Sequence, residues 1–151
     1  MERFAEFFIN HWDLFAALAI ILAMLVGGPL VRRLRGYHEV EPLQAVQLLN
    51  HESAQLVDVR ELNEFRDGHI AGSHHLPLSR FTADLAKLES WRDTPLVVGC
   101  RSGSRSARAC GILKQRGFTT VYNLKGGVMA WQSAGLPLQR EEKKSRNRRR
   151  K

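Results

Sequence analysis

The distribution of apolar residues separates a short first segment from a longer remainder. Residues 14–31, LFAALAIILAMLVGGPLV, contain no charged side chain. As a helix this run spans about 27 Å, close to the ~30 Å thickness of a bilayer's hydrocarbon core. Trp12 precedes the run where an interfacial aromatic residue would lie. The pattern therefore predicts one N-terminal transmembrane helix.

Two other interpretations of this run fit less well. A cleaved signal peptide has a positively charged start, a shorter apolar core and a small-residue cleavage site, and none of these is convincing here. A buried helix of a soluble protein is rarely apolar over this length. Arg32, Arg33 and Arg35 follow the run, so the positive-inside rule predicts an external N-terminus and a cytoplasmic remainder.

Beyond Gly36, short runs rich in β-formers alternate with amphipathic helical patterns. This alternation is typical of an α/β fold with a central parallel sheet flanked by helices. Between residues 81 and 90 the apolar residues Phe81, Leu85 and Leu88 share one helical face. The other expected elements are strands over 54–59, 73–78, 94–99 and 119–124, and helices over 43–50, 61–68, about 104–116 and after Gly126 and Gly127.

The charge of the chain is concentrated at its C-terminal end. Residues 140–151 include eight basic and two acidic side chains, whereas residues 36–139 are nearly neutral. A nucleic-acid-binding domain is therefore not indicated, and the tail is expected to contact anionic lipid headgroups, with RNA binding or simple solvation as alternatives. The predicted organisation is an N-terminal segment (1–13), a transmembrane helix (14–31), a basic linker (32–36), a soluble domain (37–138) and a basic tail (139–151).

One of only two cysteines lies where chemistry is expected. Two cysteines exclude a framework of several disulfides. Cys100 ends a predicted buried strand and precedes a predicted helix, which is where open α/β sheets place their sites. A loop there aims backbone N–H groups at one point, and nearby cations lower a thiol pKa. The expected contributors beside Cys100 are Arg101, Ser102, Gly103, Ser104 and Arg105, while the alternative is an inert core cysteine.

Three segments resemble the signatures of a rhodanese domain. They are LVDVRELNEFRDGHIAGSHHLPL (56–78), VVGCRSGSRSARAC (97–110) and LKGGVMAWQSAGLPL (124–138). With the expected anchor, the chain resembles membrane-anchored single-domain rhodaneses of the bacterial inner membrane. The resemblance implies a sulfurtransferase in which Cys100 takes sulfur from a small donor as a persulfide and passes it to a thiol or protein acceptor. It implies no metal and no organic cofactor.

Two alternative functions remain for such a loop. A cysteine phosphatase has five residues between cysteine and arginine, which would require arginine at position 106. This chain has Ser106, and the arginine comes one residue earlier at Arg105, so the loop resembles the tighter rhodanese loop. The second alternative is a protein that has the rhodanese fold but no catalytic activity, a membrane-tethered module that binds protein or ribosomal partners.

Other polar residues have structural and functional interpretations. Asp58 and Arg60 lie at the end of a predicted strand and are expected to form an ion pair or cap, with support of the loop as the alternative. Cys110 has the spacing of a core residue, with a resolving thiol as the alternative. The histidines at 69, 74 and 75 lack the ligand spacing of a zinc site.

Overall fold

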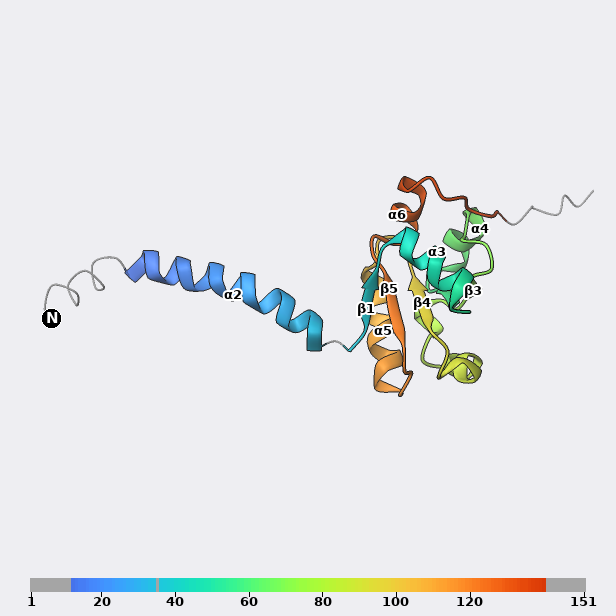
Figure 1. The fold of residues 1–151 in the computed structure, drawn as a ribbon, viewed down its shortest axis with the longest axis horizontal. Helices are drawn as coiled ribbons and strands as arrows, with labels where there is room; N and C mark the ends of the chain where they lie inside the picture. The colour runs from blue at the N-terminus through green and yellow to red at the C-terminus, as the bar shows by residue number, and fades with distance from the viewer. Residues whose placement is uncertain (1–11, 35, 141–151) are drawn as a thin grey trace, which may run out of the picture. The chain divides into compact units, whose positions relative to one another are not determined.

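The computed structural model describes residues 12–34 and 36–140, with only the backbone for residues 26–34. The chain divides into two units between Gly36 and Tyr37. The first contains helix α2 (Trp12–Leu34), which includes the expected span (Figure 1). The predicted helix is confirmed. Its predicted transmembrane character is not confirmed, because among the described residues no helix is long and apolar enough to cross a membrane. The side chains of the last part of the predicted span, from residue 26, are not described.

The second unit is built on a parallel sheet of five strands in the order β1-β5-β4-β2-β3. Every strand pairing is parallel. Four strands lie where the sequence predicted them, and β1 was missed because only three residues form it and two of them are exposed. The strands are β1 (His38–Val40), β2 (Gln55–Asp58), β3 (His74–His75), β4 (Leu96–Gly99) and β5 (Val121–Leu124).

The helices connect these strands close to the predicted positions. The α-helices are α3 (Pro42–His51), α4 (Leu62–Asp67), α5 (Ser104–Gln115) and α6 (Gly127–Ser133), and short 3-10 helices form η1 (Leu78–Arg80) and η2 (Leu85–Trp91). The expected helical segment over 81–90 is a turn followed by η2. Its three apolar residues are buried as expected, since Leu85 and Leu88 are one 3-10 turn apart.

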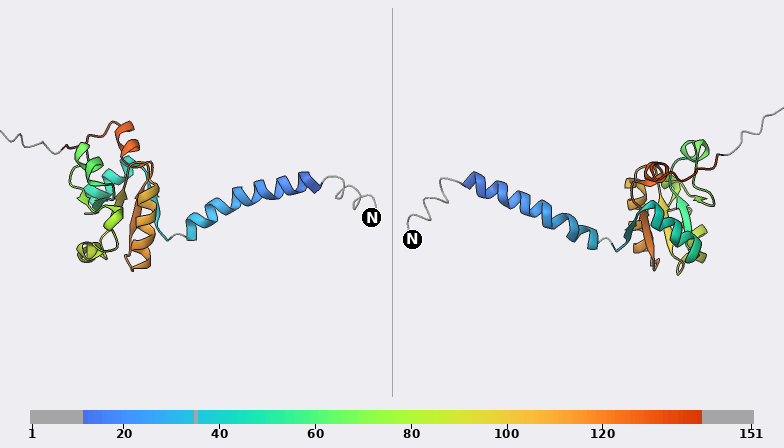
Figure 2. Two further views of the ribbon diagram at one scale, coloured as in Figure 1. Left: turned by 180° about the vertical axis from the view of Figure 1, so that it is seen from behind. Right: turned by 45° about the horizontal axis from the view of Figure 1, so that its top comes forward.

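Two apolar clusters cover the two faces of the sheet. Alternate residues of β4 point to opposite faces: Leu96 and Val98 pack with α5 and η2, whereas Val97 packs with α3 and α6. The views in Figures 1 and 2 show α5 and the pair α3 and α6 on opposite sides of the sheet. Both faces of the central strand are therefore shielded from water, and the carboxyl end of β4 opens toward the starts of α5 and α6.

The described contacts of the second unit continue past the expected end of the domain. Gln139, which the sequence assigned to the tail, forms an antiparallel bridge with His69, in which each backbone N–H donates to the other residue's carbonyl (2.8 and 2.7 Å). The last described residue is Arg140. The rest of the predicted basic tail lies outside the described residues.

Candidate active site

Cys100 lies at the carboxyl end of the central strand β4, directly before the loop that leads into α5. Its side chain has no exposed surface. Gly103 immediately precedes α5 with a φ of +95°, a left-handed conformation that glycine adopts without strain. An added Cβ at Gly103 would lie 3.2 Å from the backbone N of Gly126 and 3.3 Å from the carbonyl of Leu124. The loop therefore turns tightly around the sulfur, against the segment before α6.

The start of α6 holds the loop from the other side. The backbone N–H of Val128 donates to the carbonyl of Cys100 (2.8 Å), and that of Met129 donates to the carbonyl of Arg101 (3.1 Å). Gly127 makes this approach feasible, because an added Cβ there would overlap the backbone of Cys100 and Arg101. The loop carbonyls thus point at α6, and the loop N–H groups are left to face the sulfur.

The sulfur of Cys100 receives hydrogen bonds from two directions. The backbone N–H of Gly103 donates to Sγ at 3.1 Å, and the hydroxyl of Ser106 lies 3.3 Å from Sγ. Burial of the thiol by itself raises its pKa, but the hydrogen bonds of Ser106, Ser102 and Gly103 outweigh burial and bring the pKa of Cys100 below its ordinary value. A lower thiol pKa means more of the nucleophilic thiolate near neutral pH.

Two polar residues that the sequence analysis did not select complete this site. Ser106 is fully buried in the first turn of α5, and Asn123 is buried in β5. The Ser106 hydroxyl donates to Oδ1 of Asn123 at 2.6 Å, and Nδ2 of Asn123 donates to the carbonyl of Gly103 at 3.2 Å. These bonds connect the sheet, the loop and the helix directly around Cys100.

The two serines expected to contribute beside Cys100 lie at the surface. Ser102 and Ser104 are both exposed, and in the described part of the chain the one hydroxyl bonded to the Cys100 sulfur belongs to Ser106. Arg101 is also exposed and lines a cavity of about 380 Å³ beside the loop. Ser102 acts on the sulfur through its backbone N–H, so the loop contributes mainly main-chain donors.

Arg105 makes an ion pair that the sequence analysis did not anticipate. Its guanidinium binds the carboxylate of Glu64 in α4 through two bonds of 2.6 and 2.7 Å. The side chains of both residues are about one third exposed. The bond from Arg105 lowers the pKa of Glu64 to about 2. The positive charge of Arg105, one of the residues expected to contribute beside Cys100, is therefore neutralised by Glu64.

Asp58 and Arg60 form a buried ion pair at the end of β2. The guanidinium contacts both carboxylate oxygens at 2.7 to 3.0 Å, and it also donates to the carbonyl of Gly68 at 2.8 Å. The exposure of the side chains is 6% for Arg60 and 4% for Asp58. This is the strand-to-helix ion pair that the sequence favoured, and Arg60 also lines the cavity beside the loop.

Cys110 lies on the buried face of α5 in the same apolar cluster as Cys100. Both cysteines are free thiols. Burial raises the pKa of Cys110 far above its ordinary value, and its thiol donates weakly to the carbonyl of Tyr122 at 3.6 Å. These properties belong to a packing residue rather than to a nucleophile.

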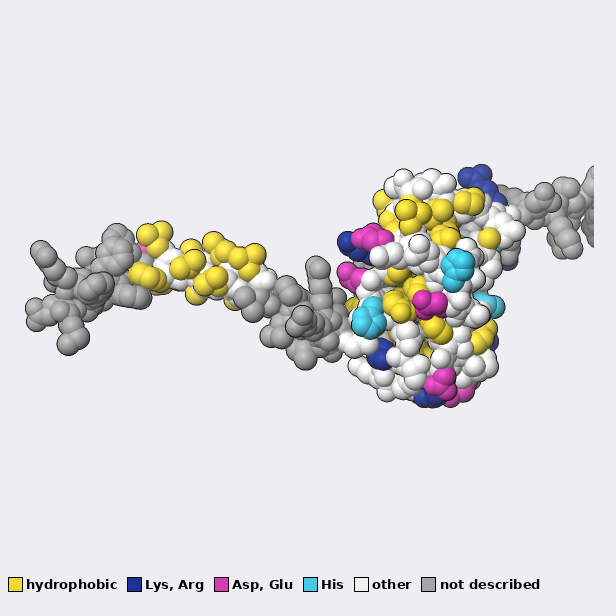
Figure 3. All heavy atoms as spheres, viewed as in Figure 1, with side chains coloured by type: hydrophobic (Ala, Val, Ile, Leu, Met, Phe, Trp, Pro, Cys, Tyr) yellow, Lys and Arg dark blue, Asp and Glu magenta, His cyan; other side chains and the backbone are white. Residues whose placement is uncertain are grey.

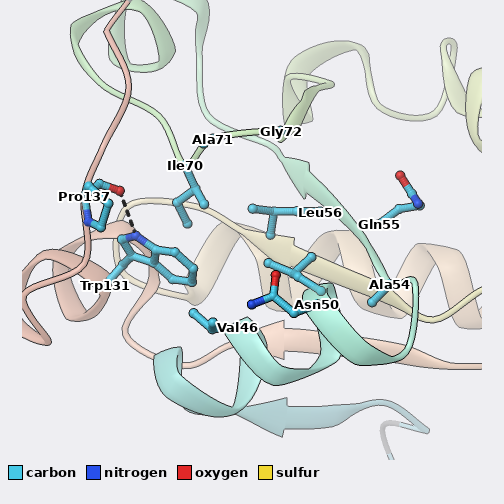
Figure 4. A pocket seen from close by; sticks show the side chains of 11 residues that line it. Val46, Asn50, Ala54, Gln55, Leu56, Ile70, Ala71, Gly72, Trp131 and Pro137 are labelled. Carbon is cyan, nitrogen blue, oxygen red and sulfur yellow. Dashed lines mark hydrogen bonds between the residues drawn. The ribbon is translucent and has the colours of Figure 1, made fainter.

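A second cavity, of about 360 Å³, lies on the opposite side of the sheet from α5 (Figure 4). Leu56 and Ile70 line it, as does Trp131, whose indole N–H donates to the carbonyl of Pro137 at 3.1 Å. None of the residues from 100 to 106 lines this cavity. It is separate from the cysteine site.

The three histidines at positions 69, 74 and 75 each form a hydrogen bond to an oxygen of the protein. His69 bonds the carbonyl of Phe65 at 3.0 Å, His75 bonds the carbonyl of Arg60 at 2.8 Å, and His74 approaches the amide of Gln55 at 3.3 Å. Within the described ranges, no group of three or more His, Cys, Asp or Glu side chains is arranged to hold a metal ion.

Comparison with known proteins identifies related sequences and folds. The sequence model of the family described as "Rhodanese-like domain" matches residues 41–134. The protein YibN of Escherichia coli is 40% identical over 98 residues, which cover 64% of this chain and 68% of YibN. The thiosulfate sulfurtransferase GlpE of Shewanella oneidensis is 38% identical over 91 residues, covering 60% of this chain and 88% of GlpE.

The relatives differ in how much of their length is matched. YqhL of Bacillus subtilis is 44% identical over 81 residues, which cover 54% of this chain and 63% of YqhL. Among solved structures, a rhodanese-related protein from Thermoplasma volcanium superposes with a TM-score of 0.62 at 31% identity, covering 68% of this chain and 98% of its own. The match to the family model lies in the second unit, and the chain spans less than two thirds of YqhL.

Proposed function

Because this chain belongs to the rhodanese-like domain family, we propose that it is a sulfurtransferase and that Cys100 carries the transferred sulfur. The observation that carries the proposal is the buried Cys100 sulfur, which accepts hydrogen bonds at the end of β4 and has a lowered pKa. Relatives named sulfurtransferase are 38% identical to this chain. A non-catalytic module would have no need of such a thiol.

The proposed reaction has two displacement steps. The Cys100 thiolate attacks the outer sulfur of a donor such as thiosulfate, a new S–S bond forms, and sulfite leaves with the electron pair of the broken bond. An acceptor thiolate then attacks the outer sulfur of the persulfide, and the electron pair of that S–S bond returns to Cys100. The backbone N–H groups of the loop support the negative sulfur in both steps.

The burial of Cys100 adds a requirement to this reaction. The sulfur has no exposed surface, whereas the neighbouring Arg101 and Ser102 are exposed. A donor therefore reaches the sulfur only when atoms that cover it move aside. Arg101 is the loop cation on the side of the cavity of about 380 Å³, and we assign to it the first contact with an anionic donor.

Intact mass measurement after incubation with thiosulfate tests the proposal. Wild type and Cys110→Ser are expected to gain one sulfur atom, and Cys100→Ser is expected to gain none. Cyanide added next should remove the sulfur as thiocyanate. Absence of any gain from thiosulfate and from glutathione persulfide would contradict the proposed function.

We also propose that α2 anchors the protein in the bacterial inner membrane, with the second unit in the cytoplasm. Support comes from the apolar run and from the arginines that follow it. Large apolar side chains of the described part of α2 are exposed, as Figure 3 shows, including Leu14, Leu18 and Ile21. The basic tail would add contacts with anionic headgroups, and RNA is its alternative partner.

Membrane fractionation of the full chain tests this second proposal. The protein is expected in the membrane pellet after an alkaline wash, and protease added to intact cells should leave the second unit whole. Recovery of the full chain in the soluble fraction would contradict the anchor.

A further inference from the structure

The hydroxyl of Ser106 has two acceptors for a single proton. Its oxygen lies 2.6 Å from Oδ1 of Asn123 and 3.3 Å from Sγ of Cys100. A serine hydroxyl donates one hydrogen bond and accepts others. Ser106 is fully buried and Asn123 is 3% exposed, so the proton must be shared between these two acceptors.

The orientation of Asn123 is determined by the loop. Its Nδ2 donates to the carbonyl of Gly103 at 3.2 Å. The reversed amide would place two acceptor oxygens against each other at this point. Oδ1 of Asn123 therefore faces Ser106 as an acceptor, and it takes the Ser106 proton whenever the sulfur does not.

The demand of the sulfur for this proton changes during sulfur transfer. A thiolate is a strong acceptor, whereas the Sγ of a persulfide is bonded to carbon and sulfur and carries little charge. The Gly103 N–H is a main-chain donor that lies 3.1 Å from Sγ and cannot turn away by itself, but the Ser106 hydroxyl is free to rotate. We propose that Ser106 is a catalytic residue whose proton rotates from Asn123 to Cys100 as sulfur leaves, and that Asn123 is a positioning residue that holds the proton while Cys100 carries sulfur.

This inference rests on the proposed function, since it concerns the two steps of transfer. It predicts unequal effects on them. A thiolate that is less stabilised is a better nucleophile, but it is a worse leaving group. Loss of the Ser106 hydroxyl should therefore slow the release of sulfur from Cys100 while leaving the loading step unchanged or faster, once Cys100 is fully ionised.

Other groups near the sulfur do not duplicate this role. Arg105 interacts electrostatically with Cys100, but its guanidinium is bound by Glu64. Among the described residues, Cys110 also interacts electrostatically with Cys100, and burial raises the pKa of Cys110, so it stays a neutral thiol. In the part of the chain that the structure describes, Ser106 is consequently the side-chain donor available to respond to the charge on Sγ.

The decisive experiment separates the two steps in the full-length Ser106→Ala variant. Loading is followed by intact mass after mixing with thiosulfate, and release is followed as thiocyanate after mixing the loaded protein with cyanide, both at a pH where Cys100 is ionised. Release should slow roughly three- to tenfold. This range follows from the strength of a hydrogen bond to a charged group, reduced because Sγ carries only part of its negative charge in the transition state. Ser133→Ala is the matched control, because this exposed serine bonds a carbonyl of its own helix.

Equal slowing of both steps in Ser106→Ala would indicate a merely structural role and overturn the proposal. Unchanged release would also overturn it. A second measurement does not need turnover: the ultraviolet absorbance of the Cys100 thiolate, taken against Cys100→Ser, should titrate at higher pH in Ser106→Ala. If wild type never takes up sulfur, the proposed function fails, and this titration still decides whether Ser106 stabilises the thiolate.

The Asn123→Ala variant tests the shared proton. The carbonyl of Gly103 also accepts from the N–H of Ala107 at 3.1 Å, so the loop keeps one anchor without Asn123. Ser106 then has Cys100 as its acceptor, and the thiolate should titrate at lower pH than in wild type. A folded Asn123→Ala protein that titrates at higher pH would overturn the role of Asn123.

Discussion

Cys100 and Cys110 lie in one apolar cluster, yet their thiol pKa values move in opposite directions. Burial raises the pKa of both. The difference comes from the hydrogen-bond donors around the sulfur, because Cys100 faces Ser106 and the loop N–H groups, whereas the Cys110 thiol itself donates to a carbonyl. Burial alone therefore does not identify a reactive cysteine, and the neighbouring donors do.

The ion pair of Glu64 makes one part of the stability depend on pH. Its carboxyl pKa is lowered to about 2 in the folded chain, chiefly by the bond from Arg105, and its ordinary value is 4.5. A lowered pKa stabilises the fold above the ordinary value, and that stabilisation is lost as the pH falls toward 2. Glu64→Gln should therefore lose less unfolding free energy than wild type between pH 4.5 and 2, by about 1 kcal/mol because the pair is partly exposed.

Urea unfolding of both proteins across this pH range checks the prediction. Parallel loss of stability in wild type and Glu64→Gln would contradict it.

In addition, Glu64→Gln leaves the charge of Arg105 uncompensated beside the loop, so the KM for the thiosulfate dianion should fall in this variant.

The buried pair of Asp58 and Arg60 should contribute far more. Asp58→Asn leaves a buried guanidinium without its counter-ion, and such a change costs about 3–5 kcal/mol of unfolding free energy. Glu89→Gln is the matched control, because Glu89 pairs with Arg92 at 2.6 Å while both side chains are more than 40% exposed. Its cost should stay below about 1 kcal/mol. Equal urea midpoints of the two variants would refute this assignment.

At the same scale, the sequence indicated Cys100 as the candidate nucleophile and did not indicate the residues that contact its sulfur. Cys100 was selected because an apolar strand runs into a loop of Ser, Arg and Gly. Ser106 was overlooked, although it has the spacing of the buried face of α5, one turn before Ala109 and Cys110. A serine at a core position and an asparagine within the apolar strand β5 were the available signals. The partners of Arg105 and of the serines depend on which residues the fold brings together, and sequence spacing does not contain that information.

At the scale of elements, the junction of the loop with α6 should be sensitive to one methyl group. Gly127→Ala places a Cβ against the backbone of Cys100 and Arg101, so the loop N–H groups are displaced and sulfur loading should fall at least tenfold. Gly135→Ala is the control, since Gly135 also has a positive φ (+74°) but open space around its Cα. The two variants thus share the backbone strain and differ in the clash.

Loading rates from intact mass, together with thermal melting, check this prediction. Equal loading by the two variants would show that contact between α6 and the loop is unimportant. The sequence predicted α6 from the paired glycines, and its role in holding the loop appears only when the sheet order β1-β5-β4 places the ends of β5 and β4 side by side.

Element boundaries were predictable to the extent that local pattern decides them. The strong periodicity of α5 and the apolar run of β4 gave both elements within a few residues. Strand β1 consists of three residues and depends on pairing with β5. The two strands lie near opposite ends of the second unit's sequence, so local pattern does not reveal their contact. The apolar spacing of segment 81–90 is compatible with an α-helix and also with a turn followed by a 3-10 helix. The residues that it buries were therefore predictable, but its backbone conformation was not.

At the scale of the whole molecule, both apolar clusters consist of residues from the second unit, from Tyr37 to Leu138. The elements around Cys100, which are β4, α5, β5 and α6, lie in it as well. Since burial of these clusters supplies the main stabilisation of the fold, a fragment of residues 37–151 should unfold at the urea concentration that unfolds the second unit of the full chain, and should load sulfur at the same rate. Comparison of the fragment with the detergent-solubilised full chain measures both quantities. A fragment that is much less stable, or inactive while folded, would mean that the first unit completes the domain, and α2 would then need a structural role in addition to the proposed anchor.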